Sequence, residues 1–390
     1  MRPLLYLDTA RLGQMSPAAK DAQIDFVRLS AEEPSSLYFE EFLRGGFNAW
    51  PSSYQNRFPG LRTWHGVAAL KQSLRRLAGA PDDRPVLLAS RSLSLVQLAA
   101  RSMFRVCRNV LTTDLSWPTY QQAVEMTAVR TGNRTTTTSL RDDILYRGWT
   151  ADDVALHLAI AFEKYQCDGL FLPAVDHLGI RLPIRKIVNR IRERAELRFC
   201  FIDAAQAFCH VPFNECVEAA DFIVVGSHKW MGAYLPTGIG LFGQSRTREL
   251  IDHRLQLSLR QVHHHDPLLN FTDQLASARL DGHSETTNLP PLFACAGASS
   301  DLLGRSVVND AFPEYQLNSV PVPNDEWQPL RPSREFRSQI VLYENAHPAK
   351  RFEKADVIRN TWLNSGSVIT AYNGGLARIS LPPNRQQPTL

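Results

Sequence analysis

The chain has 390 residues, of which 44% are hydrophobic and 21% charged, as in ordinary soluble globular proteins. Its 43 basic and 39 acidic residues leave a net charge of +4, too small and too dispersed to indicate a nucleic-acid-binding surface. No apolar run approaches the length of a membrane span, and residues 1–8 turn polar too early for a signal peptide. Six scattered cysteines without a C-x-x-C pair indicate reduced thiols, so we expect a cytoplasmic protein.

The first 66 residues predict an N-terminal arm followed by helical stretches with Pro and Gly breaks, and 67–77 predicts an amphipathic helix. Strands and helices then alternate, which favours an α/β protein with a mostly parallel sheet covered by helices on both faces. The predicted elements are strand 86–89, helix 92–105, strand 109–113, helices 121–130 and 151–165, strand 169–175, helix 183–196, and strands 199–203, 221–225 and 238–242.

The pattern changes beyond about residue 300, where a smaller α+β unit is expected. It has strands over 339–343, 367–371 and 376–381 and a helix over 354–364. The Pro-rich stretch 313–332 predicts a loop or linker, and 135–138 is a short tract of threonine. We therefore expect an N-terminal arm (1–66), a large domain (67–300) and a small C-terminal domain (301–390).

Lys229 is the most informative residue, because it follows an apolar strand and precedes a Gly-rich stretch. Asp203 ends the predicted strand 199–203, which comes before the strand that leads to Lys229. A lysine at a strand exit, with a carboxylate from a neighbouring strand, is what pyridoxal phosphate chemistry needs. The amine forms a Schiff base with the cofactor aldehyde, and the carboxylate keeps the pyridine nitrogen protonated. The alternative for Asp203 is a carboxylate that caps the next turn.

Hydroxyls and backbone N–H groups around this pair are candidates for holding the cofactor phosphate. Ser90, Arg91 and Ser92 open a helix directly after a strand, which is a favourable position for an anion, although an N-cap without a ligand is the commoner use of such a serine. The remaining candidates for the cofactor site are Ser227, His228 and Thr286.

Aromatic and polar residues near other strand ends complete the predicted site. Trp117 is the first choice for stacking on the pyridine ring and Tyr120 the second; the alternative is a core aromatic. Gln206 can touch the phenolic oxygen or the imine, and His210 can support the site or simply pack. Arg378 can bind a substrate carboxylate bidentately, or it can be a surface charge on a strand.

The cluster formed by His263, His264, His265 and Asp266 has the composition of a metal site. Consecutive residues rarely converge on one ion, however, so we expect no metal. The chain also lacks the motifs of serine hydrolases, nucleotide-binding loops and zinc proteases.

Six stretches match motifs of one known family, namely 6–10, 201–206, 227–232, 238–241, 286–288 and 377–380. Together they resemble the class V aminotransferases, fold type I pyridoxal phosphate enzymes that include cysteine desulfurases, kynureninases and an isopenicillin epimerase. The resemblance implies a large domain with a mostly parallel sheet of the seven-stranded type and a smaller C-terminal domain. It also implies a homodimer with active sites at the subunit interface, where Thr286 contacts the phosphate of the neighbouring subunit.

Some positions depart from that family. Residues 296–390 contain no cysteine, which argues against the desulfurases, since these carry a nucleophilic cysteine in the C-terminal third. Glu285 stands where the family usually has glycine. Asp176 and His177 replace a small polar loop and are either acid–base groups or part of a turn. These differences favour a branch in specialised metabolism.

We therefore predict an enzyme that acts at the α-carbon of an amino acid, with Lys229 as the base and Asp203 supporting the ring. Elimination, lyase or cyclisation chemistry is the leading hypothesis, with transamination as the alternative. A non-catalytic cofactor-binding protein is a third reading, which the intact Lys229 and Asp203 argue against. Glu285, His177 and Asp8 are the further acid–base candidates, and the substrate is placed against Arg378, Asp8 and Tyr120.

Overall fold

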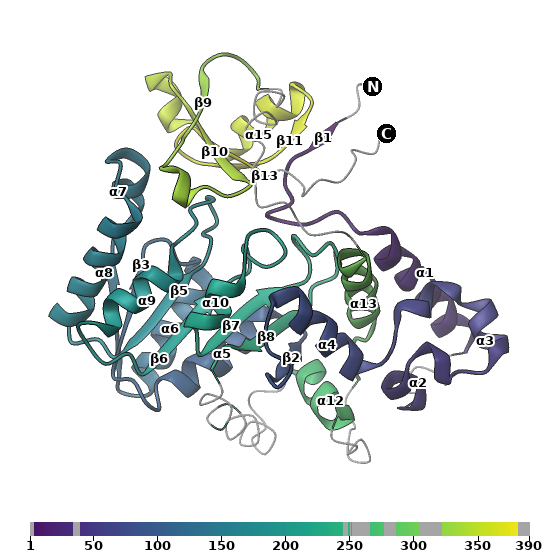
Figure 1. The fold of residues 1–390 in the computed structure, drawn as a ribbon. Coiled ribbons are helices and arrows are strands. Elements are labelled where there is room, and N and C mark those ends of the chain that lie inside the picture. Colours follow the sequence, from purple (N-terminus) through teal and green to yellow (C-terminus); the bar gives the residue numbers. More distant parts are fainter. Residues whose placement is uncertain are drawn as a thin grey trace.

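In the described part of the chain, seven strands form one sheet in the order β2-β8-β7-β6-β5-β3-β4 (Figure 1). The computed structural model describes residues 4–33, 40–244, 249, 251, 266–276, 286–304 and 322–380. All neighbouring strands run parallel except β8, which is antiparallel to β2 and to β7. The strands are β2 (Val86–Ala89), β3 (Asn109–Thr113), β4 (Arg134–Thr138), β5 (Gly169–Pro173), β6 (Phe199–Asp203), β7 (Phe222–Gly226) and β8 (Gly238–Phe242). The predicted α/β class and mostly parallel sheet are confirmed.

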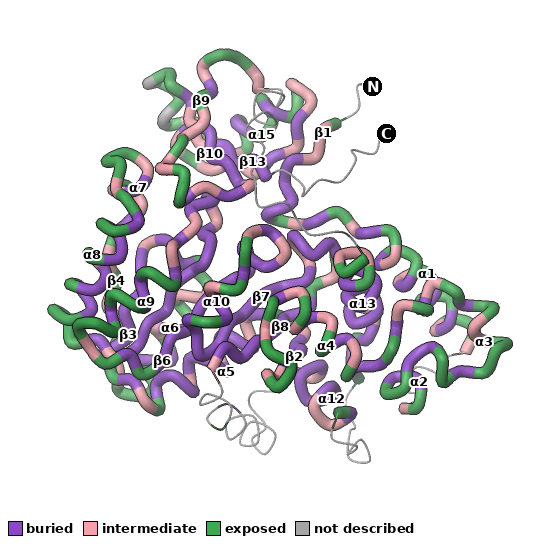
Figure 2. The backbone as a smooth tube through the Cα atoms, in the orientation of Figure 1, coloured by how far each residue is buried: buried purple, intermediate pink, exposed green. Residues whose placement is uncertain are grey.

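Helices cover both faces of this sheet, because each buried strand presents alternate apolar side chains to opposite sides. On one face, Phe201 and Phe222 pack with α5 and α6. On the other, Ile202 and Ile223 pack with α4, α8, α9, α10 and α13. The inner strands are buried along their whole length (Figure 2). The helices are α4 (Val67–Ala78), α5 (Ser92–Met103), α6 (Pro118–Arg130), α8 (Ala151–Lys164), α9 (Ile184–Arg192), α10 (Asn214–Ala219) and α13 (Pro290–Leu303).

A second, antiparallel sheet lies at the carboxyl edge of the first, in the order β12-β13-β10-β9 (Figure 1). Its core includes Trp327, Tyr343, Trp362 and Ile379. A short strand near the N-terminus, β1, pairs in parallel with β11, so an N-terminal segment joins the C-terminal part of the described chain here. The elements are β1 (Leu5–Tyr6), β9 (Trp327–Pro329), β10 (Ile340–Asn345), α15 (Ala355–Asn364), β11 (Ser367–Val368), β12 (Thr370–Tyr372) and β13 (Leu376–Ser380).

Residues 8–16 lead from β1 to α1 (Pro17–Glu32) and cross directly over the loop that follows β7. The N–H of Gly13 donates to the carbonyl of His228 at 2.8 Å, and the N–H of Ser16 donates to the carbonyl of Gly232 at 2.9 Å. A Cβ atom on Gly13 would lie 1.8 Å from the carbonyl oxygen of Lys229. Only glycine therefore allows this close approach of the two backbones.

Three sequence predictions were wrong in detail. Residues 135–138, treated as a threonine tract, lie in the edge strand β4, because β-branched side chains suit a half-exposed strand. Strand β9 lies within the stretch 313–332 that was predicted to be a loop or linker. The predicted strand 367–371 is divided into β11 and β12, which belong to different sheets.

Replacing Gly13 with alanine is expected to lower the free energy of unfolding by about 2–3 kcal/mol, because the backbone of Lys229 leaves no room for a methyl group. Urea denaturation followed by tryptophan fluorescence measures this change. Gly304→Ala is the matched control, since Gly304 is exposed, has helical backbone angles and has its nearest neighbouring atom at 3.3 Å. Equal urea midpoints for the two variants would contradict the prediction.

Candidate active site

The loops that follow the parallel strands meet around one cavity of about 390 Å³ at the carboxyl edge of the sheet. Strand β6 brings Asp203, and the loop after β7 brings Lys229. The loop after β5 brings His177, and the segment after β3 brings Trp117. Ligands of open α/β sheets bind at this edge. The second sheet closes the cavity with Arg378 of β13.

Lys229 and Asp203 both line the cavity, as the sequence predicts. Burial lowers the pKa of Lys229 to about 8, although the carboxylate of Asp203 acts in the opposite direction. Burial also raises the pKa of Asp203 to about 6, while a hydrogen bond from the N–H of Ala205 and the charge of Lys229 partly offset this effect. That hydrogen bond, 3.0 Å long, shows that Asp203 also caps the next turn.

Gln206 lines the cavity and is held by bonds at both ends of its amide. Its Nε2 donates to the carbonyl of Ala10 at 2.8 Å, and its Oε1 accepts from Nε1 of Trp230 at 2.9 Å. His210 lies behind it, stacked on Trp230 with ring centroids 3.6 Å apart. The ring accepts from the N–H of Gln339 at Nε2, so Nδ1 carries the proton and donates to the carbonyl of Gln206. His210 therefore supports the site from outside the cavity.

The predicted phosphate contacts fall into two groups. Ser92 is buried beside the cavity, donates to the carbonyl of Val225 at 3.0 Å and hydrogen-bonds Tyr120. The N–H and hydroxyl of Ser90 instead bind the carboxylate of Asp266, at 2.8 and 2.9 Å. The carboxylate of Asp266 therefore occupies the place next to Ser90 where the sequence analysis predicted a phosphate. A phosphate contact of Ser90 stays a prediction. Arg91 is exposed at the start of α5.

Of the other predicted cofactor residues, His228 lines the cavity, whereas Ser227 and Thr286 do not. Ser227 is fully buried and its hydroxyl serves the loop after Lys229, donating to the carbonyl of Leu235 and accepting from the N–H of Thr237, both at 2.9 Å. His228 lines the cavity. Burial and the charge of Lys229 lower the pKa of its imidazole to about 4. Thr286 is exposed and does not line the cavity of its own chain.

Two predictions fall outside the described residues, namely Glu285 and the histidines His263, His264 and His265. Across the ranges given above, no three metal-binding side chains lie together. In the same ranges, no helix has both the length and the apolar character to cross a bilayer.

Three aromatic rings form one wall of the cavity. The ring of His177 lies edge-to-face between Trp117, at 5.4 Å, and Tyr372, at 6.0 Å. Burial is the main cause that lowers the pKa of His177 to about 4, and nearby positive charges add to it. Its imidazole is therefore neutral at physiological pH. Tyr120 also lines the cavity, and burial raises the pKa of its phenol.

Arg378 is buried, so the alternative of a surface charge is wrong. Its Nη2 donates to Oδ1 of Asp8 and to the hydroxyl of Thr370, both at 3.0 Å, and its Nη1 donates to the carbonyl of His177 at 3.0 Å. Both Asp8 and Arg378 lie almost wholly out of contact with solvent. The guanidinium that was predicted to bind a substrate carboxylate is thus already paired with a carboxylate of the chain.

Unpaired polar atoms gather in this cavity. Eleven buried side-chain nitrogen or oxygen atoms of the described residues have no hydrogen-bond partner, and four of them belong to residues that line it. The four are Oδ2 of Asp176, Nδ1 of His177, Nδ1 of His228 and Nε of Arg378. Each such atom costs about 1–3 kcal/mol when it stays unpaired, so their clustering indicates a site for a polar ligand.

The family model of class V aminotransferases matches residues 59–256, about half of the chain. The chain therefore belongs to the class V aminotransferase family, as the sequence motifs predict. Members of this family are enzymes that depend on pyridoxal phosphate. No curated protein sequence matches the chain significantly.

Solved structures with the same fold include three enzymes of different activity. Ureidoglycine–glyoxylate aminotransferase from Bacillus subtilis is 13% identical, with a TM-score of 0.65 over 98% of this chain and 89% of its own. Alanine–glyoxylate aminotransferase from Nostoc is 14% identical, with a TM-score of 0.64 over 98% and 91%. The cystine C–S lyase C-DES is 15% identical, with a TM-score of 0.64 over 98% and 94%. A variant of C-DES carries glycine covalently linked to the cofactor.

The residues of the cavity fit pyridoxal phosphate. Lys229 is an amine with a pKa lowered to about 8, and Asp203 is a buried carboxylate in the same cavity. The unpaired atoms of His228 and of the Asp176–His177 pair can meet polar groups of a cofactor or a substrate.

Sequence reasoning missed Thr370, Tyr372 and Arg11, which also line the cavity. A signal for the first two was present, because Asn373, Gly374 and Gly375 form a turn between two strand-like runs. That turn predicts a hairpin, and the register of the hairpin places Thr370 opposite Arg378.

Uptake of pyridoxal phosphate by the apo-protein is expected to accelerate as the pH rises through about 8, because only the neutral amine of Lys229 attacks the cofactor aldehyde. Asp203 stabilises the charged amine, so Asp203→Asn is expected to move the midpoint to lower pH. Stopped-flow absorbance across this pH range measures the midpoint. Asp221→Asn, a buried carboxylate that does not line the cavity, is the control. A midpoint that stays in place or rises in Asp203→Asn would sink the prediction.

Proposed function

We propose that this chain is a pyridoxal-phosphate enzyme that acts at the α-carbon of an amino acid, with Lys229 as the residue that bonds to the cofactor and later moves the α-proton. The observation that carries the proposal is the convergence of Lys229, Asp203 and four unpaired polar atoms on one cavity. Membership of the class V family supports the same conclusion.

Each residue has a chemical task in this proposal. When bound, pyridoxal phosphate supplies an electron sink conjugated to the α-carbon of the substrate. Asp203 is the carboxylate that holds a proton on the pyridine nitrogen by a charge-assisted hydrogen bond. Because burial lowers the pKa of Lys229 to about 8, a larger fraction of its amine is neutral near pH 7 than in an ordinary lysine, and the neutral amine can serve as a general base.

Elimination or other lyase chemistry remains our leading hypothesis for the reaction. A departing group needs a proton, and burial raises the pKa of Asp176 to about 6, close to working pH. The neutral imidazole of His177 is available beside it as an acceptor. The cystine lyase C-DES shows that this fold accommodates such chemistry, whereas the two similar aminotransferases support transamination as the alternative.

Desulfurase chemistry with a catalytic thiol is disfavoured. All six cysteines are described, and none lines the cavity. Burial raises the pKa of Cys295, the last in the chain, to about 12, so its thiol does not ionise near neutral pH.

We further propose a homodimer in which the active sites are shared. Thr286 matches a family position that contacts the phosphate, yet it is exposed and lies outside the cavity of its own chain. Thr286 of one subunit can therefore contact the cofactor phosphate in the partner subunit without changing the cavity of the subunit to which it belongs.

Purified wild type is expected to develop a visible absorbance band with pyridoxal phosphate, and one class of amino acid should shift it. Lys229→Ala should lose or alter the band, while Lys20→Ala, which changes an exposed lysine on α1, should behave as wild type. Product formation without an added keto acid identifies a lyase, whereas dependence on a keto acid identifies an aminotransferase. A folded wild type without any band would refute the proposed function.

Mixed dimers test the shared site. Thr286→Asp is expected to repel the cofactor phosphate, and Lys229→Ala removes the covalent attachment. If the site is shared, each mixed dimer contains one intact site, built from Lys229 of one subunit and Thr286 of the other. Borohydride reduction followed by mass spectrometry should then find cofactor on the Lys229 of the Thr286→Asp subunit. Two results would overturn the shared site. One is that the mixed dimers hold no more covalently attached cofactor than the separate variants, and the other is that sedimentation velocity shows a monomer.

A further inference from the structure

The segment that follows β1 brings Arg11 to the opening of the main cavity, the cavity of about 390 Å³ that holds Lys229. Arg11 lines this cavity and is exposed. Among the described residues, no ion pair and no side-chain hydrogen bond involves its guanidinium. A guanidinium keeps its charge at any physiological pH and offers five N–H donors in a planar fork. All of these donors are therefore available to a ligand.

The backbone around Arg11 is held in place by both sheets. The N–H of Arg11 donates to the carbonyl of Asp8 at 2.9 Å. The N–H of Ala10 donates to the hydroxyl of Ser380 in β13 at 2.8 Å, and the carbonyl of Ala10 accepts from Nε2 of Gln206, after β6, at 2.8 Å. The start of the Arg11 side chain is therefore fixed, and a ligand has to order only the part beyond it, which limits the entropy lost on binding.

Arg11 is the cation of the cavity lining that has no carboxylate partner among the described residues. The other two cations of the lining are Arg378 and Lys229. Arg378 is paired with Asp8 at 3.0 Å, and the carboxylate of Asp203 acts on Lys229. A negatively charged group of a ligand therefore gains most beside Arg11, because no carboxylate of the chain already offsets the attraction there.

Arg11 and Arg378 lie on the same side of the main cavity. Asp8 connects them, since its carbonyl accepts from the N–H of Arg11 at 2.9 Å and its carboxylate accepts from Nη2 of Arg378 at 3.0 Å. Both guanidinium groups also act on the phenol of Tyr6. Burial and the charge of Asp8 raise the pKa of Tyr6, whereas the two arginines lower it and offset part of the shift. An amino acid with its α-carboxylate at Arg378 would thus have a second, unpaired arginine on the same side.

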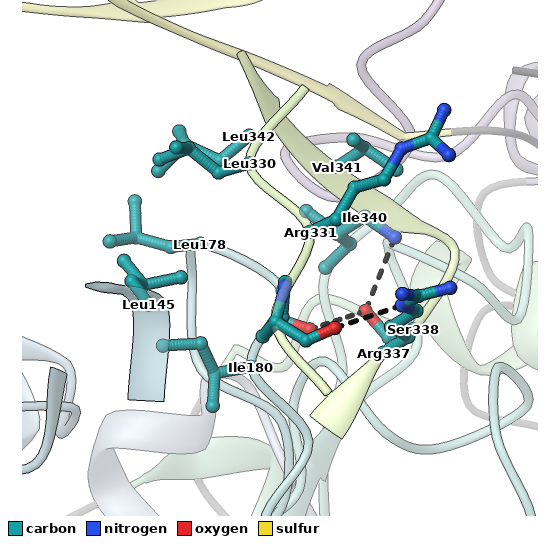
Figure 3. A pocket seen from close by; sticks show the side chains of 12 residues that line it. Leu145, Leu178, Ile180, Leu330, Arg331, Arg337, Ser338, Ile340, Val341 and Leu342 are labelled. Carbon is teal, nitrogen blue, oxygen red and sulfur yellow. Dashed lines mark hydrogen bonds between the residues drawn. The ribbon is translucent and has the colours of Figure 1, made fainter. Parts of the chain in front are cut away.

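A second pocket, lined by parts of the second sheet, offers no comparable place for a substrate side chain (Figure 3). Its volume is about 40 Å³, its lining is mainly apolar, with Leu145, Ile180 and Leu342 among its residues, and it shares no lining residue with the main cavity. The Nε of Arg337, which also lines it, donates to the carbonyl of Pro332 at 2.9 Å. Room for a substrate side chain therefore lies in the main cavity.

We infer that Arg11 determines substrate specificity by binding a carboxylate or phosphate group on the side chain of the amino acid. The substrate class is thus an amino acid with an acidic side chain, whose α-carboxylate lies toward Arg378 and whose second acidic group lies toward Arg11. This inference rests on the proposed function, since it takes the substrate to be an amino acid bound in this cavity.

The test compares acidic amino acids with neutral counterparts on the holoenzyme. The pairs are glutamate with glutamine, aspartate with asparagine, and O-phosphoserine with serine, and the dissociation constants come from titration of the visible absorbance. Wild type is expected to bind at least one acidic amino acid about tenfold or more tightly than its counterpart, because a charge-assisted bond to a guanidinium is stronger than a bond to a neutral group. Arg11→Gln should remove most of this preference, leaving the affinity for the neutral counterpart and the spectrum without amino acid unchanged.

Two further measurements separate a bound charge from a structural effect. Because Arg11 is exposed, added salt should weaken the preference of wild type. Arg11→Lys keeps the charge but loses the planar fork, so it should retain part of the preference. Arg62→Gln is the matched control, because Arg62 is also exposed but does not line the cavity. It should keep the preference of wild type.

Three results would overturn the inference. They are no preference for an acidic amino acid in wild type, an unchanged preference in Arg11→Gln, and an equal loss of affinity for acidic and neutral amino acids in Arg11→Gln. The last result would place the α-carboxylate, and not the side chain, at Arg11. The wild-type comparison stands even if Arg11→Gln does not fold. Failure of wild type to take up cofactor is separate, since it refutes the proposed function as well.

Discussion

The buried ion pair between Asp8 and Arg378 connects parts of the chain that are far apart in sequence. Asp8 follows β1, Arg378 lies in β13, Thr370 of β12 bridges them, and Arg378 reaches the carbonyl of His177 in the loop after β5. Removing one partner of such a pair leaves an uncompensated charge, at a typical cost of about 3–5 kcal/mol. The pair therefore fixes the second sheet against the loops that form the cavity.

The same ion pair shapes the electrostatics of the site. Because Asp8 neutralises Arg378, a substrate carboxylate meets a guanidinium whose charge is already balanced and whose Nε alone is unpaired. Arg378 still contributes to the lowering of the pKa of Lys229, to about 8, although burial is the larger cause. In the proposed function, a substrate carboxylate bound at Arg378 would lie beside Asp8 or displace it, so the N-terminal segment would take part in substrate recognition.

Local sequence patterns predicted the fold and much of the site, and tertiary contacts account for the rest. Strand ends of a parallel sheet meet at one edge, so Asp203 and Lys229 could be paired from sequence alone. The partners of Arg378 and Ser90 could not, because Asp8 and Asp266 come from 370 and 176 residues away. Edge strand β4 was missed because its threonines are only half buried and show no apolar period.

Paired and unpaired groups divide the cavity into two parts. Around Gln206, each amide atom of the side chain has a partner, and the loop that carries Lys229 is held by Gly13 and Ser16. Around Asp176 and His177, rigid backbone carries side-chain atoms without partners. Preorganised groups that lack partners are the ones a ligand can satisfy with the greatest gain. The part around Asp176 and His177 is therefore the one where a bound ligand gains most by supplying hydrogen-bond partners.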